Sequence, residues 1–326
     1  MLPRSLVAAI VAVAAFAAPN ISFAEPVIDT PVAQASRDAA APLRREKLGV
    51  GRLFNNDFFG DTQDRWRTGS YSISYVKGYG WDGVLPQSFG DILEFRFRSS
   101  IIAPANLENP VAPPDDRPYA GSLSFGLHSH WQNGPYALSA GADLVVTGPQ
   151  TGLSRFHGAA HEALGMPAPG DLSGQVPNGF HPKLTAEVGR EYRLNRKVAL
   201  RPFAEVTAGP ENILRVGGDM MVGRSATGQL MIRDAGTGQR YQATRFTPER
   251  GFSFVLGGDM AYVDRSIYLP ASSGLELTPI RARLRSGVHW QGKKAAAFAG
   301  VTWLGREFET QPEGQFVGSL RLRLRF

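Results

Sequence analysis

The sequence predicts an all-β protein, a transmembrane antiparallel β-barrel of about twelve strands with a short helical extracellular loop. Three observations predict it. Short segments alternate apolar and polar residues over most of the chain, the last of these segments ends on the aromatic Phe326, and the first residues resemble a secretory signal. Segments of about ten residues with one apolar and one polar face are the pattern of bacterial outer-membrane barrels.

The alternation is clearest at the C-terminus. Side chains alternate between the two faces of a strand, so residues 320–326 place leucines and Phe326 on one face and three arginines on the other. Residues 280–285 repeat this arginine pattern, and residues 93–98 and 183–188 also alternate. A soluble β-sandwich would alternate too, but the many arginines and glutamates on one face suit a crowded polar lumen.

Twelve segments match this pattern, and an even number suits a bacterial barrel. Closure of the barrel removes the free strand edges that lipid could not satisfy. The predicted strands are 48–57, 67–77, 91–101, 118–131, 135–147, 183–193, 198–208, 211–224, 252–263, 278–290, 294–308 and 316–326.

The chain divides into three parts. Residues 1–24 predict a signal peptide, because Arg4 precedes an apolar run of residues 6–18 and a small-residue cleavage site that ends at Ala24. That run is too short for a helical span of about 20 residues. Residues 25–46 predict a flexible mature N-terminus, and residues 47–326 form the barrel. We therefore expect a chain that is exported to the outer membrane of a Gram-negative cell.

Composition narrows the class of partner. The chain has no cysteine, which excludes a disulfide framework, and its formal net charge is +6. An anionic lipid surface is a natural partner for a basic exported chain, and we expect no nucleic acid partner.

Two long segments interrupt the strand pattern. Residues 153–164 predict a helix that Ser154 caps and Gly165 ends, in a loop long enough to be extracellular. Residues 222–251 carry five arginines, and we expect them to form a basic hairpin that protrudes outward near anionic lipid headgroups. These are Arg224, Arg233, Arg240, Arg245 and Arg250.

Asn56 and Asp57 form the first candidate site, at the end of the first strand. Their oxygens suit a hard cation such as calcium, and they could also orient a catalytic histidine. The same pair is common in turns, and the local residues alone favour a turn.

The segment 113–121 forms the second candidate site. Arg117 could grip a phosphate with two parallel hydrogen bonds, and Tyr119 could lie at the membrane interface. Alternatively, the segment is a rigid turn in which Arg117 pairs with Asp115 or Asp116, and this alternative is favoured when the segment is taken alone.

His157 and His161 form the third candidate site, one turn apart on the predicted helix. Such spacing suits zinc, but Gly158 stands where the common zinc-protease motif has glutamate. A single histidine that acts as general base for water is the better chemical interpretation, because histidine titrates near neutrality. A histidine without any role is equally common at this spacing.

In this order, these stretches resemble the outer-membrane lipid A 3′-O-deacylase family over most of the mature chain. The resemblance rests on Asn56-Asp57, on the run from Asp64 to Gly69, on Asp116-Arg-Pro-Tyr-Ala-Gly, on Val146-Thr-Gly-Pro with His161-Glu-Ala-Leu-Gly, and on residues 179–187. It implies a twelve-stranded barrel whose active site lies between the barrel wall and a helical outer loop, and a reaction supported by calcium.

The resemblance also implies roles for individual residues. The general base corresponds to His161, the Asn-Asp pair to Asn56 and Asp57, a nearby hydroxyl to Thr68, and an acidic residue to Glu187. The chain departs from the family at His157, where glutamine is frequent, and at Phe180, where tryptophan is frequent. These departures bear on acyl preference and activity rather than on the fold.

The expected reaction is hydrolysis of the 3′-linked acyl ester of lipid A. His161 takes a proton from water, a calcium ion partly held by Asp57 stabilises the developing oxyanion, and Arg117 binds a lipid phosphate. No Gly-x-Ser-x-Gly elbow is present, which argues against an α/β-hydrolase. We expect a monomer. A porin, a structural or adhesive barrel, and a barrel phospholipase remain as alternatives.

Overall fold

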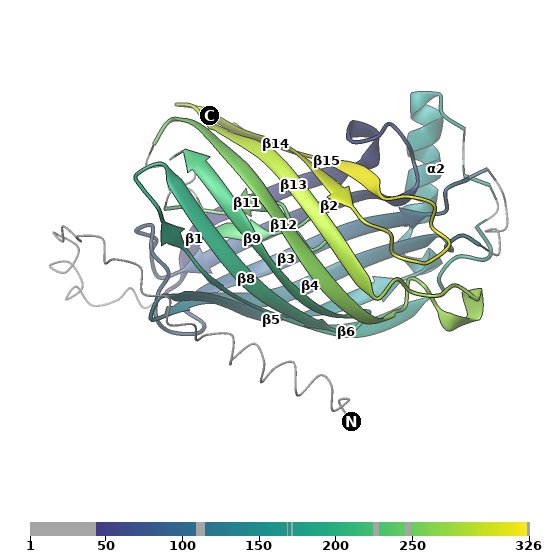
Figure 1. Ribbon diagram of the computed structural model, residues 1–326, viewed down its shortest axis with the longest axis horizontal. Coiled ribbons are helices and arrows are strands. Elements are labelled where there is room, and N and C mark those ends of the chain that lie inside the picture. The colour runs from purple at the N-terminus through teal and green to yellow at the C-terminus, as the bar shows by residue number, and fades with distance from the viewer. Residues whose placement is uncertain are drawn as a thin grey trace, which may run out of the picture.

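In the computed structural model, twelve antiparallel strands form a closed barrel (Figure 1). The structure describes residues 44–108, 115–167, 169–170, 172–223, 228–244 and 249–324. The signal peptide predicted at 1–24, most of the N-terminal segment predicted at 25–46, and Phe326 lie outside these residues.

The strands follow one another around the barrel in sequence order, and β1 closes the ring by pairing with β15. The twelve predicted strands are confirmed, with bounds that differ by at most four residues. They are β1 (Glu46–Asn56), β2 (Trp66–Gly78), β3 (Ile92–Ala103), β4 (Ala120–Asn133), β5 (Tyr136–Thr147), β6 (Gly179–Arg190), β8 (Val198–Ala208), β9 (Glu211–Gly223), β12 (Gly251–Ser266), β13 (Ile280–Gln291), β14 (Ala295–Leu304) and β15 (Gln315–Leu324), and a two-residue strand, β7 (Tyr192–Arg193), extends the sheet beside β8.

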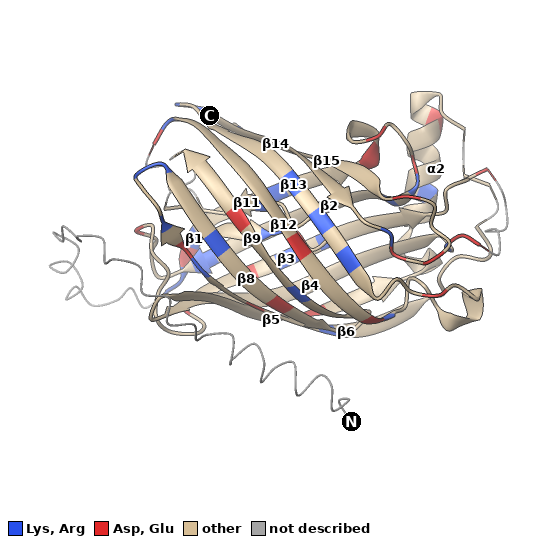
Figure 2. Ribbon diagram, in the orientation of Figure 1, with Lys and Arg blue, Asp and Glu red and all other residues tan. Residues whose placement is uncertain are grey.

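The alternation places apolar side chains outside and polar side chains inside. Phe252, Phe254 and Leu256 on β12 are exposed, as lipid contact requires, whereas Asp259 on the same strand is buried in the lumen. Charged positions therefore occur along the barrel strands as well as at both ends of the barrel (Figure 2). Inside the lumen, Asp259 accepts hydrogen bonds from Arg215, Arg283 and Arg285. The arginine stripe of β13 thus faces carboxylates, whereas Arg321 and Arg323 on β15 donate to amide and backbone oxygens.

The basic stretch 222–251 does not protrude as expected. Its described part folds back into the lumen as a hairpin of β10 (Met231–Arg233) and β11 (Arg240–Gln242). Arg233 donates hydrogen bonds to Glu187 and Asp219, while Ile232 and Tyr241 pack against inward-facing apolar residues such as Leu53. The expectation was wrong because partners for both the charges and the apolar side chains of this segment lie inside the barrel. Arg224 and Arg245 lie outside the described residues.

The predicted helix is confirmed as α2 (Leu153–Leu164), and Gly165 ends it with a φ of 69°. Glycine tolerates this left-handed conformation, which is common at helix ends. Gly152 rather than Ser154 occupies the N-cap, so the helix begins at Leu153, two residues earlier than a Ser154 cap would place it, directly after the short 3₁₀ turn η2 (Pro149–Thr151). None of the helices in the described part of the chain has the length and apolar character of a membrane-spanning helix.

Candidate active site

The loop that carries α2 packs against the outer wall of the barrel. Ser122 and Ser124 on β4 line a cavity inside the lumen, so Gly121 faces outward. A methyl group added at Gly121 would lie 2.9 Å from the Thr151 hydroxyl and 3.0 Å from Leu153 Cβ. The absence of a side chain at Gly121 therefore lets the start of α2 approach the wall closely.

We expect Gly121→Val to displace the start of α2 from the wall while the barrel still folds. A shift of about 1 Å at catalytic groups costs on the order of 10²-fold in rate, so the variant should lose most of its activity. Gly158→Ala is the matched control, because the added methyl group meets open space. Lipid A hydrolysis, the reaction expected from the sequence, is measured on both purified variants to test this, and equal rates would show that the close contact at Gly121 does not position the site.

Two histidines of α2 and one aspartate converge at this wall. His157 and His161 are both buried, and their rings meet edge to face with centroids 4.4 Å apart. The Nε2 atoms of His161 and His157 lie 2.7 Å and 3.2 Å from the same oxygen, Asp64 Oδ2. The loop between β1 and β2 supplies Asp64, so the site joins two extracellular loops that are 93 residues apart in the chain.

The neighbours of the His161 ring fix the position of its Nδ1 proton. His161 Nδ1 donates a hydrogen bond to the Pro167 carbonyl oxygen over 2.6 Å, and a carbonyl oxygen can only accept. The nitrogen available for proton transfer is therefore Nε2. Tyr119 stacks on His157 with its hydroxyl oxygen 3.4 Å from Nδ1, and Tyr119 is itself buried against Ala103 and Leu107.

The two histidines control the charge of Asp64. Burial raises the pKa of Asp64, but the hydrogen bond from His157 and the positive charges of His157 and His161 hold it below its ordinary value. Asp64 is therefore a carboxylate at neutral pH, and it stabilises a protonated imidazole beside it.

Asn56 and Asp57 form a turn and also bring a second carboxylate to this end of the barrel. The Asn56 side chain caps the 3₁₀ turn η1 (Asp57–Phe59) by accepting a hydrogen bond from the Phe58 amide. Asp57 is only 1% exposed, and its Oδ2 accepts from the Arg65 amide, whereas its Oδ1 is buried without a hydrogen-bond partner. Burial, together with the charges of Asp64 and Asp61, raises the pKa of Asp57 to about 9.

Three predicted site residues remain. Thr68 lies near the cluster of His157, His161 and Asp64, whereas Glu187 and Arg117 lie away from it. Thr68 is buried at the top of β2, and its hydroxyl is one of the groups that lower the pKa of Asp64. Glu187 lies in the lumen, where it pairs with Arg201 and Arg233. It faces the inserted hairpin, on the part of β6 far from α2, and the structure does not bring it to His161.

Arg117 does not lie at the surface. It is completely buried, and its guanidinium pairs with Glu307 at 2.6 Å rather than with Asp115 or Asp116. Glu307 also pairs with Arg67 and lies near Arg281, so these side chains form a network beneath the extracellular loops. A direct grip on a lipid phosphate, as expected from the sequence, is inconsistent with this burial.

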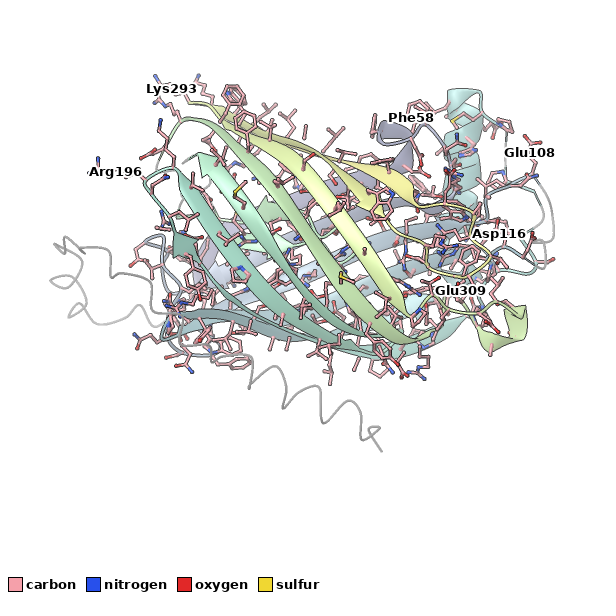
Figure 3. All side chains as sticks on the ribbon, in the orientation of Figure 1. Phe58, Glu108, Asp116, Arg196, Lys293 and Glu309 are labelled. Atoms are coloured by element: carbon pink, nitrogen blue, oxygen red, sulfur yellow. The ribbon has the colours of Figure 1, made fainter. Side chains whose placement is uncertain are left out.

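Figure 3 shows the side chains at both ends of the barrel. Phe58, Glu108, Asp116 and Glu309 mark the end that carries α2, and Arg196 and Lys293 mark the opposite end. The sequence did not assign roles to Asp64 and Tyr119 beside the histidines. The only available signal was their place in two of the family-like runs, Asp64–Gly69 and Asp116–Gly121.

Comparisons with known proteins agree with this architecture. The family model described as outer membrane protein LpxR matches residues 10–326. LpxR from Salmonella typhimurium is similar in structure, with a TM-score of 0.71 and 17% identity over 85% of this chain and 100% of that chain. The β-domain of the Bordetella autotransporter BrkA gives a TM-score of 0.43 at 13% identity, covering 86% of this chain and 99% of that chain. No curated protein sequence matches this chain.

Proposed function

Because the chain belongs to the LpxR family of outer membrane proteins, we propose that it hydrolyses lipid A, removing the acyl or acyloxyacyl chain linked at the 3′ position. The observation that carries the proposal is the geometry of His161. Its Nδ1 is fixed to the Pro167 carbonyl, and its Nε2 lies beside the Asp64 carboxylate, on the outer wall of the barrel. Both groups stabilise the imidazolium that forms when His161 takes a proton from water.

In the proposed reaction, His161 Nε2 takes a proton from water as the water oxygen attacks the ester carbonyl carbon. The tetrahedral intermediate then collapses, the bond from carbon to the sugar oxygen breaks, and the protonated His161 returns a proton to that oxygen. Asp64 and the Pro167 carbonyl stabilise the positive imidazolium in between. Histidine needs no serine nucleophile for this chemistry.

The position of the site suits a lipid substrate. Phe156 and Leu164 on α2 and Phe58 on η1 are exposed large apolar side chains in the loops that build the cluster. An outer-leaflet lipid can therefore reach His161 from the membrane without entering the lumen. A single chain supplies all the residues of the cluster, so we propose that the protein acts as a monomer, after cleavage of its signal peptide near Ala24.

A calcium ion is part of the proposal, and the residues around Asp57 fit one. Calcium takes oxygen ligands, and Asp57 offers a buried carboxylate oxygen without a hydrogen-bond partner, close to the negative charges of Asp61 and Asp64. We propose that Asp57 holds the ion with support from Asn56. When bound, calcium stabilises the negative charge that develops on the carbonyl oxygen.

Asp57→Asn is expected to raise the calcium concentration needed for half-maximal activity by at least about tenfold. The substitution keeps an oxygen and the shape of the side chain but removes the carboxylate that binds the cation once calcium displaces the proton of Asp57. Calcium titrations of hydrolysis by wild type and by Asp57→Asn test this, with Asp264→Asn as control, because Asp264 is exposed on β12 away from the site. Equal calcium dependence in all three proteins would exclude Asp57 as a ligand.

The alternatives differ in what they require. A porin needs an open lumen, whereas the hairpin β10–β11 and the arginine–carboxylate pairs occupy this one. A phospholipase would use the same His161 chemistry, so only the substrate separates it from a lipid A hydrolase.

Mass spectrometry of lipid A decides the proposal. Cells that express the wild type with calcium present should lose one 3′-linked acyl or acyloxyacyl group, and cells that express His161→Ala should not. Unchanged lipid A in both, with the barrel folded in the outer membrane, would contradict the proposal. Release of fatty acid from phospholipid alone would identify a phospholipase instead.

A further inference from the structure

We propose that His157, His161 and Asp64 form a binding site for a borderline divalent cation of the zinc class, and that this cation inhibits the enzyme by occupying His161. The inhibition rests on the proposed function, whereas the binding of the cation does not. It concerns a different cation from the calcium assigned to Asp57, with a different ligand set.

The donor atoms already converge. One ligand atom from each of the three residues lies within 4.8 Å of the others, and the two Nε2 atoms lie 2.7 Å and 3.2 Å from Asp64 Oδ2. Zinc binds nitrogen and oxygen at about 2.0–2.1 Å, so ligand atoms on one ion lie roughly 3–3.4 Å apart. Small side-chain shifts are enough to bring the three atoms to a common ion.

The hydrogen bonds around the rings favour a cation between them. Because His161 Nδ1 donates to the Pro167 carbonyl, a neutral His161 presents a lone pair at Nε2 directly toward the Asp64 carboxylate. Two acceptors at this distance need a positive charge between them, which a proton or a metal ion can supply. The Pro167 carbonyl and the Tyr119 hydroxyl also hold the two rings from behind, as outer-shell partners do at metal sites.

The ligand types select the class of ion. Two imidazoles and one carboxylate suit zinc, nickel or cobalt. Calcium prefers six to eight oxygens and gains little from imidazole. His157 is the residue that creates this preference, because it adds a second imidazole one helical turn before His161.

The consequence for activity follows from the same atom. The nitrogen that would take the proton from water is the nitrogen that would bind the metal. Zinc at this site removes the lone pair of His161 and should stop hydrolysis at concentrations near its own dissociation constant.

Binding is tested first, without any activity. Zinc is titrated into the purified mature barrel in detergent, by calorimetry and by competition with a chromophoric chelator, and cobalt is added separately to record its visible absorption spectrum. We expect one equivalent to bind and the cobalt spectrum of a nitrogen–oxygen site of low coordination number. His157→Gln, His161→Gln and Asp64→Asn should each weaken binding at least about tenfold, since even outer-shell changes at zinc sites cost 10–100-fold.

His181→Gln is the matched control, because His181 contacts Thr147 and lies outside the cluster. It should bind zinc like the wild type. The same affinity in all four variants would overturn the proposed site, as would displacement of zinc by calcium at similar concentrations. A change in electrophoretic mobility on heating reports whether each barrel is folded.

Inhibition is tested second. The hydrolysis rate of each protein in the presence of zinc is compared with the rate of the same protein in its absence. Hydrolysis by the wild type should fall as zinc passes the measured dissociation constant, and calcium in excess should not restore it. Activation by zinc, or full activity at saturating zinc, would overturn the inhibitory role. A barrel that binds zinc through the three residues but never hydrolyses lipid A would contradict the proposed function and leave the metal site standing.

Discussion

His161→Gln is expected to lower the rate of lipid A hydrolysis by a factor of about 10²–10⁴, the usual contribution of a general base. Glutamine fills a similar volume and can still donate a hydrogen bond to the Pro167 carbonyl, so α2 should keep its place. It has no nitrogen that can take a proton from water at neutral pH. The loss should therefore appear in kcat, measured with purified protein and lipid A in mixed micelles.

His181→Gln is the control for this experiment, since it makes the same chemical change at a different histidine, which is half-buried beside Thr147. It should hydrolyse lipid A at the wild-type rate. If His161→Gln retains more than about a tenth of the wild-type rate while His181→Gln is fully active, another group removes the proton.

Asp259→Ala is expected to reduce the free energy of unfolding by about 3–5 kcal/mol, because it removes a carboxylate shared by three buried arginines, of which only Arg215 and Arg285 pair with a second carboxylate in the described residues. Asp259 is buried and accepts hydrogen bonds from Arg215, Arg283 and Arg285. Asp264→Ala on the same strand removes an exposed carboxylate and should have an effect within about 0.5 kcal/mol. Denaturant unfolding of the two variants in lipid vesicles measures the difference.

The same pair of variants separates stability from catalysis. Since the proposed active site lies on the outer wall and Asp259 lies in the lumen, the folded fraction of Asp259→Ala should hydrolyse lipid A at nearly the wild-type rate. If Asp259→Ala is as stable as Asp264→Ala, then solvent or rearranged partners compensate the three arginines for the lost carboxylate. A loss of activity in the folded fraction would show that the lumen network also positions the site.

The strands could be predicted because two independent constraints act on each of them. Lipid outside requires an apolar residue at every second position, and a crowded lumen requires charge or small polar groups at the positions between, as in Arg281, Arg283 and Arg285. A period-two pattern of this kind is visible in the local sequence. The helix could also be predicted from the local sequence, since Gly165 ends it and no strand pattern interrupts residues 153–164.

The site could be predicted only in part. His161 stood out through its chemistry and its place in a family-like run, but its partner Asp64 lies 97 positions earlier in the numbering, in a different loop. No local pattern records that the β1–β2 loop and α2 meet at the top of the wall. Arg117 was misplaced for a related reason, because its partner Glu307 comes from the β14–β15 loop, 190 residues away.

The hairpin β10–β11 shows the same limit more strongly. Its arginines predict an anionic partner, which is right, but the sequence does not say whether that partner is lipid phosphate outside or Glu187 and Asp219 inside. The positive charge of the arginines predicts that the partner is negative, and only the fold decides where that partner lies.

The sequence by itself determined the barrel, the number of its strands and the outer helix, because each depends on periodicity or residue type along one segment. It also singled out His161 by residue type, and the catalytic role of this histidine stays a prediction. Only the tertiary structure decided which carboxylate faces His161, that Arg117 is buried, and that the basic hairpin enters the lumen. These outcomes depend on contacts between segments far apart in the chain, where the gain from burying a charge or an apolar side chain depends on what closure of the barrel places beside it.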